Sequence, residues 1–369
     1  MSDPSDTIPS AFHHGEHAMQ TRLGVRDQLE QLGARLMRDH MPDQHRELFA
    51  KLPMVLLGSM DDKGQPWASV LTRAQGLMTS SSAQQLDIHT LPLANDPLAH
   101  NLKPGAPVGM LGIEPHTRRR NRMNGRVAAI DKQGFSISVQ QSFGNCPKYI
   151  QARSPLMSSD TTAQLPQPAD AELTTEVAIA PTAALAATSS PIRSDTLTPA
   201  MQAIIARADT YFIASAAGRE LDPSNPSQGV DISHRGGKPG FVLVNDSRTL
   251  TAPDFIGNFF FNTLGNLTVY PKAGLLFIDF DTGDLLYLAT TAEILFDPEQ
   301  AQAYTGAQRL LRFAIEQAIL LPQAMLLRWS APQLSPVLAA TGSWQSNERP
   351  SESTSDGISE STTAGEPAQ

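Results

Sequence analysis

Short apolar runs separated by polar turns fill two stretches of the chain, roughly 53–141 and 210–296. Runs of five to eight residues between turns with glycine are typical of antiparallel β-strands. In the first stretch these turns are Asp62-Lys63-Gly64, Lys103-Pro104-Gly105 and Lys132-Gln133-Gly134. A short helix is expected near Asp96. The pattern therefore predicts two mainly β units.

Four other segments have a helical pattern. Residues 16–40 place leucines three and four positions apart, which predicts one amphipathic helix that ends before Pro42. Shorter helices are expected over 43–52, from Thr198 or Pro199 through Arg207, and over 305–319. The last is based on four apolar residues, Leu310, Leu311, Ala314 and Ile315.

The two β units share an order of elements. In the first, strand-like 54–59 and 68–73 precede helix-like 96–102 and apolar 108–113. In the second, 211–215, 229–235, 262–267 and 273–278 follow in the same order. An arginine closes the second strand of both units, Arg73 and Arg235. This recurrence predicts an internal duplication, and two copies indicate paired domains rather than a solenoid.

Composition suggests where the domains end. Residues 154–197 are dominated by Ala, Thr, Ser and Pro, and a segment that buries so little apolar surface stays unfolded. We expect a flexible N-terminus over 1–15, a first domain with N-terminal helices over 16–153 and a flexible linker or insertion over 154–197. A second domain over 198–332 and a disordered tail over 333–369 follow.

The overall composition excludes several classes of protein. The chain has 369 residues, 40% of them hydrophobic and 18% charged, as in ordinary globular domains. A net charge of −9 argues against nucleic acid as a partner. No apolar run reaches the roughly 20 residues that cross a membrane. The polar start lacks a secretory signal, and the single Cys146 fits a reducing compartment, so we expect a cytoplasmic protein.

The segment 231–242 has the strongest local signal for chemistry. A strand ends in Ser233, His234 and Arg235, and Gly236 follows at once. Glycine lets backbone N–H groups turn towards an anion, and arginine can donate two hydrogen bonds to a phosphate. The spacing is not that of a Walker loop. A hairpin turn with exposed cations explains the same residues, so the sequence alone leaves both interpretations open.

The arginine-rich run at 118–122 also has two interpretations. Arg118, Arg120 and Arg122 share one side of a strand because side chains alternate. They either form a solvated face, which we favour, or reach across a domain interface to a cofactor or an anionic substrate.

Two further motifs favour structural explanations. Cys146 has no base near it in the sequence, which favours a small buried thiol over a nucleophile. His13, Glu16 and His17 have the spacing of an inverted zinc-peptidase motif. Gly15 within that motif and its position near the N-terminus favour helix capping and solvated histidines, so no metal site is expected.

Several motifs together resemble a known family. They are His-Arg-Gly-Gly-Lys-Pro-Gly-Phe-Val at 234–242, the stretches 261–267 and 271–277, and in the first half 61–73, 96–113, 117–127 and 142–150. These segments resemble the FMN-binding split barrels of the pyridoxamine 5′-phosphate oxidase superfamily, in particular its two-barrel members. The resemblance covers roughly 12–153 and 198–330. It implies a mainly β fold with flanking helices (α+β), built as two antiparallel split β-barrels.

The resemblance also implies a function. It implies an FMN-dependent oxidoreductase acting on an unknown small molecule or a redox partner protein, with a homodimer possible. A non-catalytic flavin- or haem-binding protein is the alternative, and a haem-degrading enzyme is a third possibility. Some family members continue into a ferredoxin-reductase-like part, which here would have to be a separate protein.

The site residues implied by the resemblance lie in the second barrel. Arg235 is the expected phosphate ligand, with its neighbours on the strand and residues at the following helix start in support. The cofactor-binding set is Ser233, His234, Arg235, Gly236, Lys238, Asn262, Thr263 and Asn266. The family commonly has a Ser-Arg-Lys type stretch where Asn262 and Thr263 stand, so two cations are missing. In the first barrel, Asp96 at the corresponding place would repel a phosphate.

Overall fold

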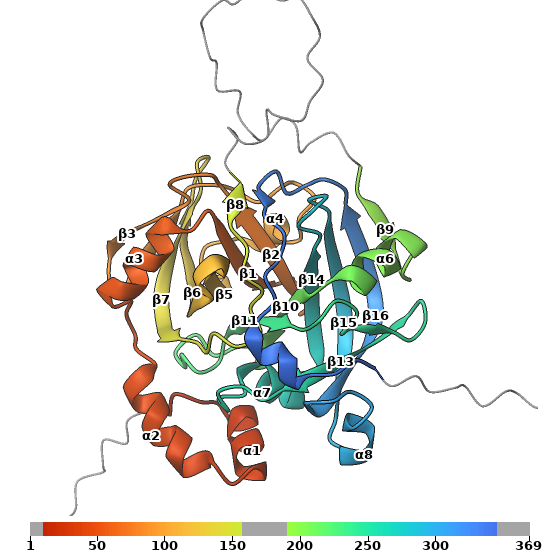
Figure 1. Cartoon of the computed structure of the whole chain (residues 1–369). Coiled ribbons are helices and arrows are strands. Elements are labelled where there is room, and N and C mark those ends of the chain that lie inside the picture. Colours follow the sequence, from red (N-terminus) through yellow and green to blue (C-terminus); the bar gives the residue numbers. More distant parts are fainter. Residues whose placement is uncertain (1–9, 157–189, 345–369) are drawn as a thin grey trace, which may run out of the picture.

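The computed structural model describes residues 10–156 and 190–344, and it is mainly β, with two antiparallel sheets side by side and helices around them (Figure 1). Within these residues each sheet stays open between its edge strands. The expected mainly β, antiparallel class is therefore confirmed. No helix in the described part of the chain is both long and apolar enough to cross a lipid bilayer.

The first domain contains a seven-stranded sheet in the order β2-β1-β5-β6-β7-β4-β3. Its strands are β1 (Met54–Met60), β2 (Pro66–Thr72), β3 (Met78–Ser82), β4 (Gln85–Ile88), β5 (Pro107–Glu114), β6 (Arg119–Ile130) and β7 (Phe135–Gly144). Its helices are α1 (His14–Arg22), α2 (Arg26–Leu36), α3 (Asp43–Lys51), α4 (Leu98–Asn101) and the 3-10 turn η1 (Pro115–Thr117).

The second domain contains an eight-stranded sheet in the order β11-β10-β14-β15-β16-β13-β12, with β9 (Ile192–Ser194) added on β16. Its strands are β10 (Thr210–Ala216), β11 (Val230–Gly236), β12 (Leu243–Val244), β13 (Thr249–Phe255), β14 (Lys272–Ile278), β15 (Leu285–Leu295) and β16 (Ala307–Leu321). Its helices are α6 (Pro199–Arg207), α7 (Asn262–Val269), α8 (Pro298–Ala301) and the 3-10 turn η2 (Pro336–Ala340).

The two sheets have the same topology. Each is built from four strands, a helix and three strands in chain order, and the strands lie in the same spatial order. The register agrees residue by residue, because Gly58 pairs with Gly109 and with Ala68, while Ala214 pairs with Gly274 and with Ile232. A β-bulge follows Asn124 in β6 and Ala289 in β15, which is the same place. We call residues at matching places equivalent.

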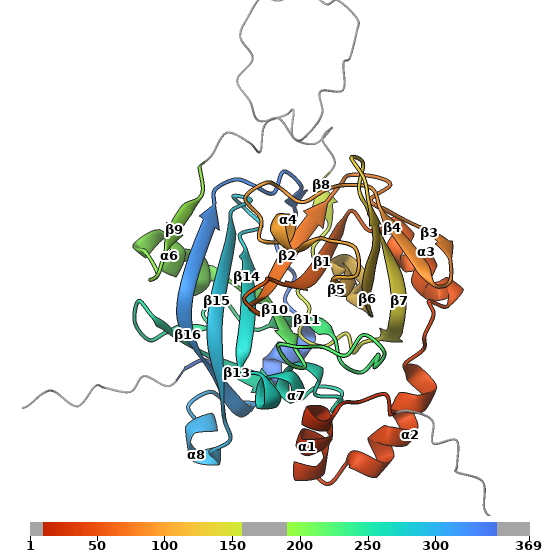
Figure 2. The same ribbon diagram turned by 180° about the vertical axis from the view of Figure 1, so that it is seen from behind.

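Two equivalent glycines let the sheets pack closely. A Cβ atom on Gly109 of β5 would lie 2.3 Å from the carbonyl oxygen of Val230 on β11. A Cβ atom on Gly274 of β14 would lie 2.3 Å from the carbonyl oxygen of Pro66 on β2. Strand β11 of the second domain thus packs against β5 of the first domain, and β2 of the first domain packs against β14 of the second. The ribbon seen from behind shows β2 beside β14 (Figure 2).

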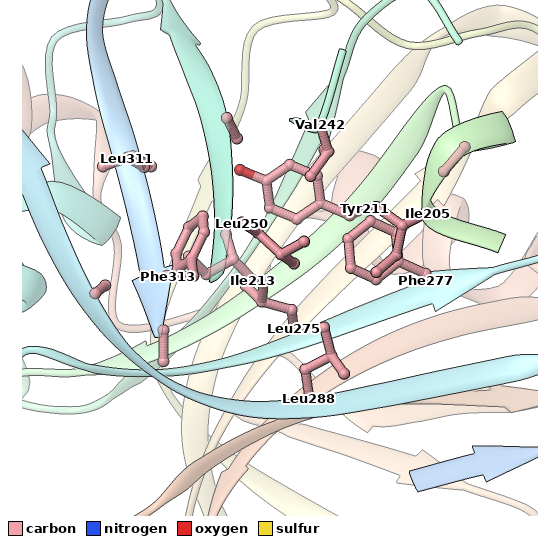
Figure 3. Close-up of a cluster of buried hydrophobic side chains, with 14 of the residues drawn as sticks. Ile205, Tyr211, Ile213, Val242, Leu250, Leu275, Phe277, Leu288, Leu311 and Phe313 are labelled. Atoms are coloured by element: carbon pink, nitrogen blue, oxygen red, sulfur yellow. The ribbon is translucent and has the colours of Figure 1, made fainter. Parts of the chain in front are cut away.

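The alternating apolar residues of the second sheet form its core. Tyr211 stacks on Phe277 with ring centroids 5.6 Å apart, and Phe313 meets Tyr211 edge-on at 6.4 Å. Ile213, Leu275 and other aliphatic side chains fill the space around these rings (Figure 3). A second apolar cluster contains residues of both sheets, so the domains share part of their core.

The helix expected over 16–40 is two helices. α1 ends at Arg22 and α2 starts at Arg26, because Gly24 has a φ of 68° that no right-handed helix contains. Leu23 and Leu36, which the single helix would have buried, are 44% and 40% exposed. The helices expected over 43–52 and from Pro199 to Arg207 are confirmed, and Thr198 caps the second of them.

The helix expected over 305–319 was wrong, since these residues form most of the long strand β16. Leu311, Phe313 and Ile315 are buried while Arg312, Ala314 and Glu316 are exposed, which is the alternation of a strand. Strand β16 pairs with both β15 and β13, and this pairing outweighs the local helical pattern.

Three segments expected to lack structure are partly ordered. Phe12 is buried, although it lies in the N-terminus expected to be flexible. The segment expected as a linker begins in β8 (Pro155–Leu156), which pairs with β17 (Arg328–Trp329), and ends in β9. The expected tail contains η2 within its first residues. The remainder of these segments, 1–9, 157–189 and 345–369, lies outside the described residues.

Candidate functional site

A pocket of about 640 Å³ lies between the two domains. The first domain contributes the start of β6 and the loop after β7, and the second contributes β11, the end of β13 and the loop into α7. Its polar lining residues are Arg120, Arg122, Asn145, Cys146, Lys148, Tyr149, Ser233, His234, Arg235, Asp254, Asn258, Asn262 and Thr263.

Arg122 crosses from β6 to the second domain. Its guanidinium lies 3.5 Å from the Asp231 carboxylate, donates to the Asn262 side-chain oxygen at 3.0 Å and contacts the Ser233 hydroxyl. Burial lowers the pKa of Arg122, while Asp231 opposes that shift. The structure therefore agrees with the interpretation that alternate arginines reach the domain interface. Arg118 differs, because it donates to backbone carbonyls, among them that of Ile150.

Arg120 lies in the same pocket without a carboxylate partner. Its Nε donates to the Cys146 carbonyl oxygen at 2.6 Å, and none of the ion pairs among the described residues includes it. Burial, and next the neighbouring Arg122, lower the pKa of Arg120 to about 9. The guanidinium therefore stays charged at neutral pH, and the side chain is half-buried.

Arg235, the residue expected to hold a phosphate, lines the pocket but already has a partner. It forms an ion pair with Asp254, and Nε of Arg309 lies 3.6 Å from the same carboxylate. Its charge is therefore partly neutralised, which sequence spacing could not show.

Four more of the expected ligands line the pocket. The hydroxyl groups of Ser233 and Thr263 are 2.8 Å apart, and Asn262 lies beside them. His234 is buried, and its ring meets Phe212 edge-on at 5.7 Å. Burial, followed by the nearby Arg120, places the pKa of His234 well below its usual value, so the ring is neutral.

The remaining three expected ligands are not among the pocket-lining residues. Lys238 donates to the Thr341 carbonyl oxygen at 2.5 Å. Gly236 packs against the backbone of Tyr149, whose carbonyl oxygen would lie 2.0 Å from an added Cβ. Asn266 is fully buried and donates to Ser215 at 3.0 Å and Asp231 at 2.9 Å.

Glu16 is a site neighbour that sequence reasoning missed. Its carboxylate accepts hydrogen bonds from the Asn262 side chain and from the backbone N–H of His13, which caps α1. Burial, and then the nearby Asp231, raise the pKa of Glu16 well above its usual value. The expected helix cap is confirmed, but His13 is buried rather than solvated. The capping-box spacing was a signal for the helix, not for the contact with Asn262.

No metal site is found in the described part of the chain, where no three His, Cys, Asp or Glu side chains converge. Cys146 is half-buried at the pocket wall, whereas the sequence had favoured a small buried thiol.

The known proteins that resemble the chain resemble it only weakly. No protein-family model and no curated protein matches it. An alignment with HupZ of Group A Streptococcus covers 34% of this chain and 98% of that chain, at 15% identity and a TM-score of 0.26. A putative pyridoxamine 5′-phosphate oxidase from Lactobacillus delbrueckii aligns with 34% of this chain and 94% of its own, at 16% identity and a TM-score of 0.26.

An FMN-binding protein from Syntrophomonas wolfei aligns with 32% of this chain and 80% of its own, at 16% identity and a TM-score of 0.23. TM-scores this low carry no information about the function of the chain.

Proposed function

We propose that the protein binds FMN in the pocket between its domains and is an FMN-dependent oxidoreductase for a small molecule or a redox partner protein. The observation that carries the proposal is Arg120, a pocket-lining guanidinium with no ion-pair partner among the described residues. A half-buried cation without a counter-charge loses part of its hydration at a cost in free energy, and an anionic ligand offsets that cost.

The charge of the pocket supports an anion. Arg120, Arg122, Lys148 and Arg235 line it, whereas Asp254 is the acidic residue among its lining residues. Guanidinium groups bind phosphate oxygens through paired hydrogen bonds.

Aromatic side chains supply the apolar part of the pocket. The rings of Tyr149 and Phe255 stack with centroids 5.1 Å apart. Phe259 and Phe261, which also line the pocket, lie on the loop between β13 and α7. Flat rings of this kind pack well against a flat ligand. Bound flavin supplies the redox chemistry, while the arginines hold its phosphate and the aromatic rings exclude water.

The two domains are proposed to be split barrels that arose by duplication. Besides the common topology, each has a buried asparagine that donates to an equivalent serine: Asn101 to Ser59 at 2.9 Å, and Asn266 to Ser215 at 3.0 Å. A crystal structure in which the two sheets had different registers would contradict a common origin.

Titration with FMN and riboflavin tests the binding proposal. Wild-type protein should prefer FMN, because riboflavin lacks the phosphate. Arg120→Ala should weaken FMN binding by about 1.5–3 kcal/mol and leave riboflavin binding nearly unchanged. Arg73→Ala is the matched control, since Arg73 is outside the pocket and donates to the carbonyl oxygens of Gly76 and His89. Equal affinity for both flavins, or no flavin uptake, would refute the proposal.

A non-catalytic flavin- or haem-binding protein is the second candidate. It is favoured by two properties of the pocket residues: the carboxylate of Asp254 is ion-paired, and burial holds the pKa of His234 so far below its usual value that the ring stays unprotonated at neutral pH. Steady oxidation of a reduced nicotinamide or of pyridoxamine phosphate by the flavin-loaded protein would eliminate this candidate. A spectral titration with haemin, followed by a reductant, distinguishes haem binding and haem degradation from both.

A further inference from the structure

Because the two sheets have the same topology, the pocket residues on β11, β6 and the loop before α7 have equivalent residues around the first sheet. The strand registers make Ser69 of β2 equivalent to Ser233 of β11, and Tyr287 of β15 equivalent to Arg122 of β6. Counting back from the equivalent asparagines Asn101 and Asn266, Asp96 is equivalent to Phe261. The first-domain copy therefore consists of Ser69, Asp96 and Tyr287.

This first-domain copy contains a carboxylate bound by hydroxyl groups. The Ser69 hydroxyl donates to Oδ1 of Asp96 at 2.5 Å, and the Tyr287 hydroxyl donates to Oδ2 at 2.8 Å. The backbone N–H of Leu98 donates to Oδ1 at 2.9 Å. Ser69 and Tyr287 are 0% exposed and Asp96 is 1% exposed, so the carboxylate is enclosed.

Two cations of the second-domain pocket have apolar equivalents here. Leu285 is equivalent to Arg120, and Leu71 is equivalent to Arg235. Both leucines line a separate, mainly apolar pocket of about 640 Å³. The first-domain copy thus has no guanidinium to attract an anion from solution, and an acidic side chain of the chain itself lies where the polar groups converge.

We infer that the carboxylate of Asp96 fills, in the first domain, the place that the anionic group of the ligand takes in the second. Each chain then binds one ligand, whose anionic group contacts Ser233, Thr263 and Arg122. The identity of the ligand as FMN rests on the proposed function. The role of the Asp96 carboxylate in the first domain does not depend on it. In the second domain Phe261 replaces the acid, so an anion from outside supplies the missing charge.

Rescue by formate tests the role of Asp96. Asp96→Ala leaves two buried hydroxyl groups without an acceptor, and the midpoint of thermal unfolding should fall by roughly 5 °C. Sodium formate, a carboxylate small enough for the vacated space, should raise the midpoint of this variant in a saturable manner. Sodium chloride at the same ionic strength should not, and formate should stabilise the wild-type protein less than this variant.

A double variant locates the formate. Asp96→Ala with Tyr287→Phe lacks one of the two hydroxyl donors, so its formate response should be reduced or lost. If Asp96→Ala does not fold alone, folding only in the presence of formate supports the inference. A variant that formate stabilises no more than wild type, or that fails to fold with formate present, overturns it.

The stoichiometry of FMN provides an independent readout. One FMN per chain is expected for the wild type, and two per chain would overturn the inference while leaving the proposed function intact. Absence of flavin binding would refute the proposed function, and the formate experiment would still decide the role of Asp96.

Discussion

Arg235 and Asp254 form an ion pair at the wall of the pocket, and Arg309 shares the same carboxylate. Asp254 is 4% exposed and Arg309 is 7% exposed, so this cluster lies largely out of water. In the proposed FMN complex, Asp254, which is itself part of the pocket lining, therefore competes with the phosphate for Arg235.

Asp254→Asn should end that competition. With one negative charge removed, FMN should bind about tenfold more tightly, which corresponds to about 1.4 kcal/mol. The ligand-free variant should be less stable by about 3–5 kcal/mol, because Arg309 loses its buried partner. Fluorescence titration and thermal unfolding measure the two effects. Unchanged or weaker FMN binding in a folded Asp254→Asn protein would show that the acid does not limit Arg235.

The pH dependence of stability should report on Asp96. Burial raises the pKa of Asp96 from 3.8 to about 6 in spite of its three hydrogen bonds. The folded protein therefore keeps a proton that the unfolded chain releases, and the free energy of unfolding decreases as pH rises from about 4 to about 6. The contribution is on the order of 3 kcal/mol. Asp96→Asn should lack this decrease in urea unfolding across that range, and parallel curves for both proteins would contradict it.

His45 should act in the opposite direction. Burial, with Arg38 and Arg119 nearby, lowers the pKa of His45 from 6.5 to about 4. The unfolded chain binds a proton that the folded protein excludes, so stability is lost as pH falls from about 6.5 to about 4. His45→Asn, which retains a polar partner for Ser142, should be less sensitive to acid in this range, whereas His100→Asn at an exposed position should behave like the wild type. Equal acid sensitivity of all three proteins would rule out this role.

The close approach of the sheets should make Gly274 intolerant of a side chain. Gly274→Ala places a methyl group 2.3 Å from the Pro66 carbonyl oxygen, which requires the sheets to move apart. We expect a loss of about 1–3 kcal/mol in chemical denaturation. Gly229→Ala is the control, since an added Cβ there has no atom within 4 Å. Similar losses for both variants would show that sheet packing is not the cause.

Local sequence patterns were sufficient for the two mainly β units as far as Leu295 and for the capped helix α6, but they missed β8 and β9 within the expected linker. They failed for β16, because two pairs of apolar residues four positions apart fit a helix as well as a long strand. Only the pairing with β13 and β15 decides between them. Gly24 could have been recognised as a break in the first helix, since glycine accommodates a positive φ.

Only the second-domain side of the pocket was predictable from the sequence. The end of β11 and the start of α7 were identified from Ser233, Arg235, Asn262 and Thr263. Alternation placed Arg120 and Arg122 on a common face of β6, but it does not tell which surface lies opposite. The Glu16 contact joins residues 246 positions apart, so no spacing rule could reveal it.

Gly109 packs against β11 of the second domain, and Gly274 packs against β2 of the first domain. Because each sheet depends on these contacts, we expect the two domains to unfold as one cooperative unit. Calorimetry should show a single transition rather than one for each half. A half expressed alone would expose the sheet face that its counterpart covers, and such a flat, apolar face promotes aggregation.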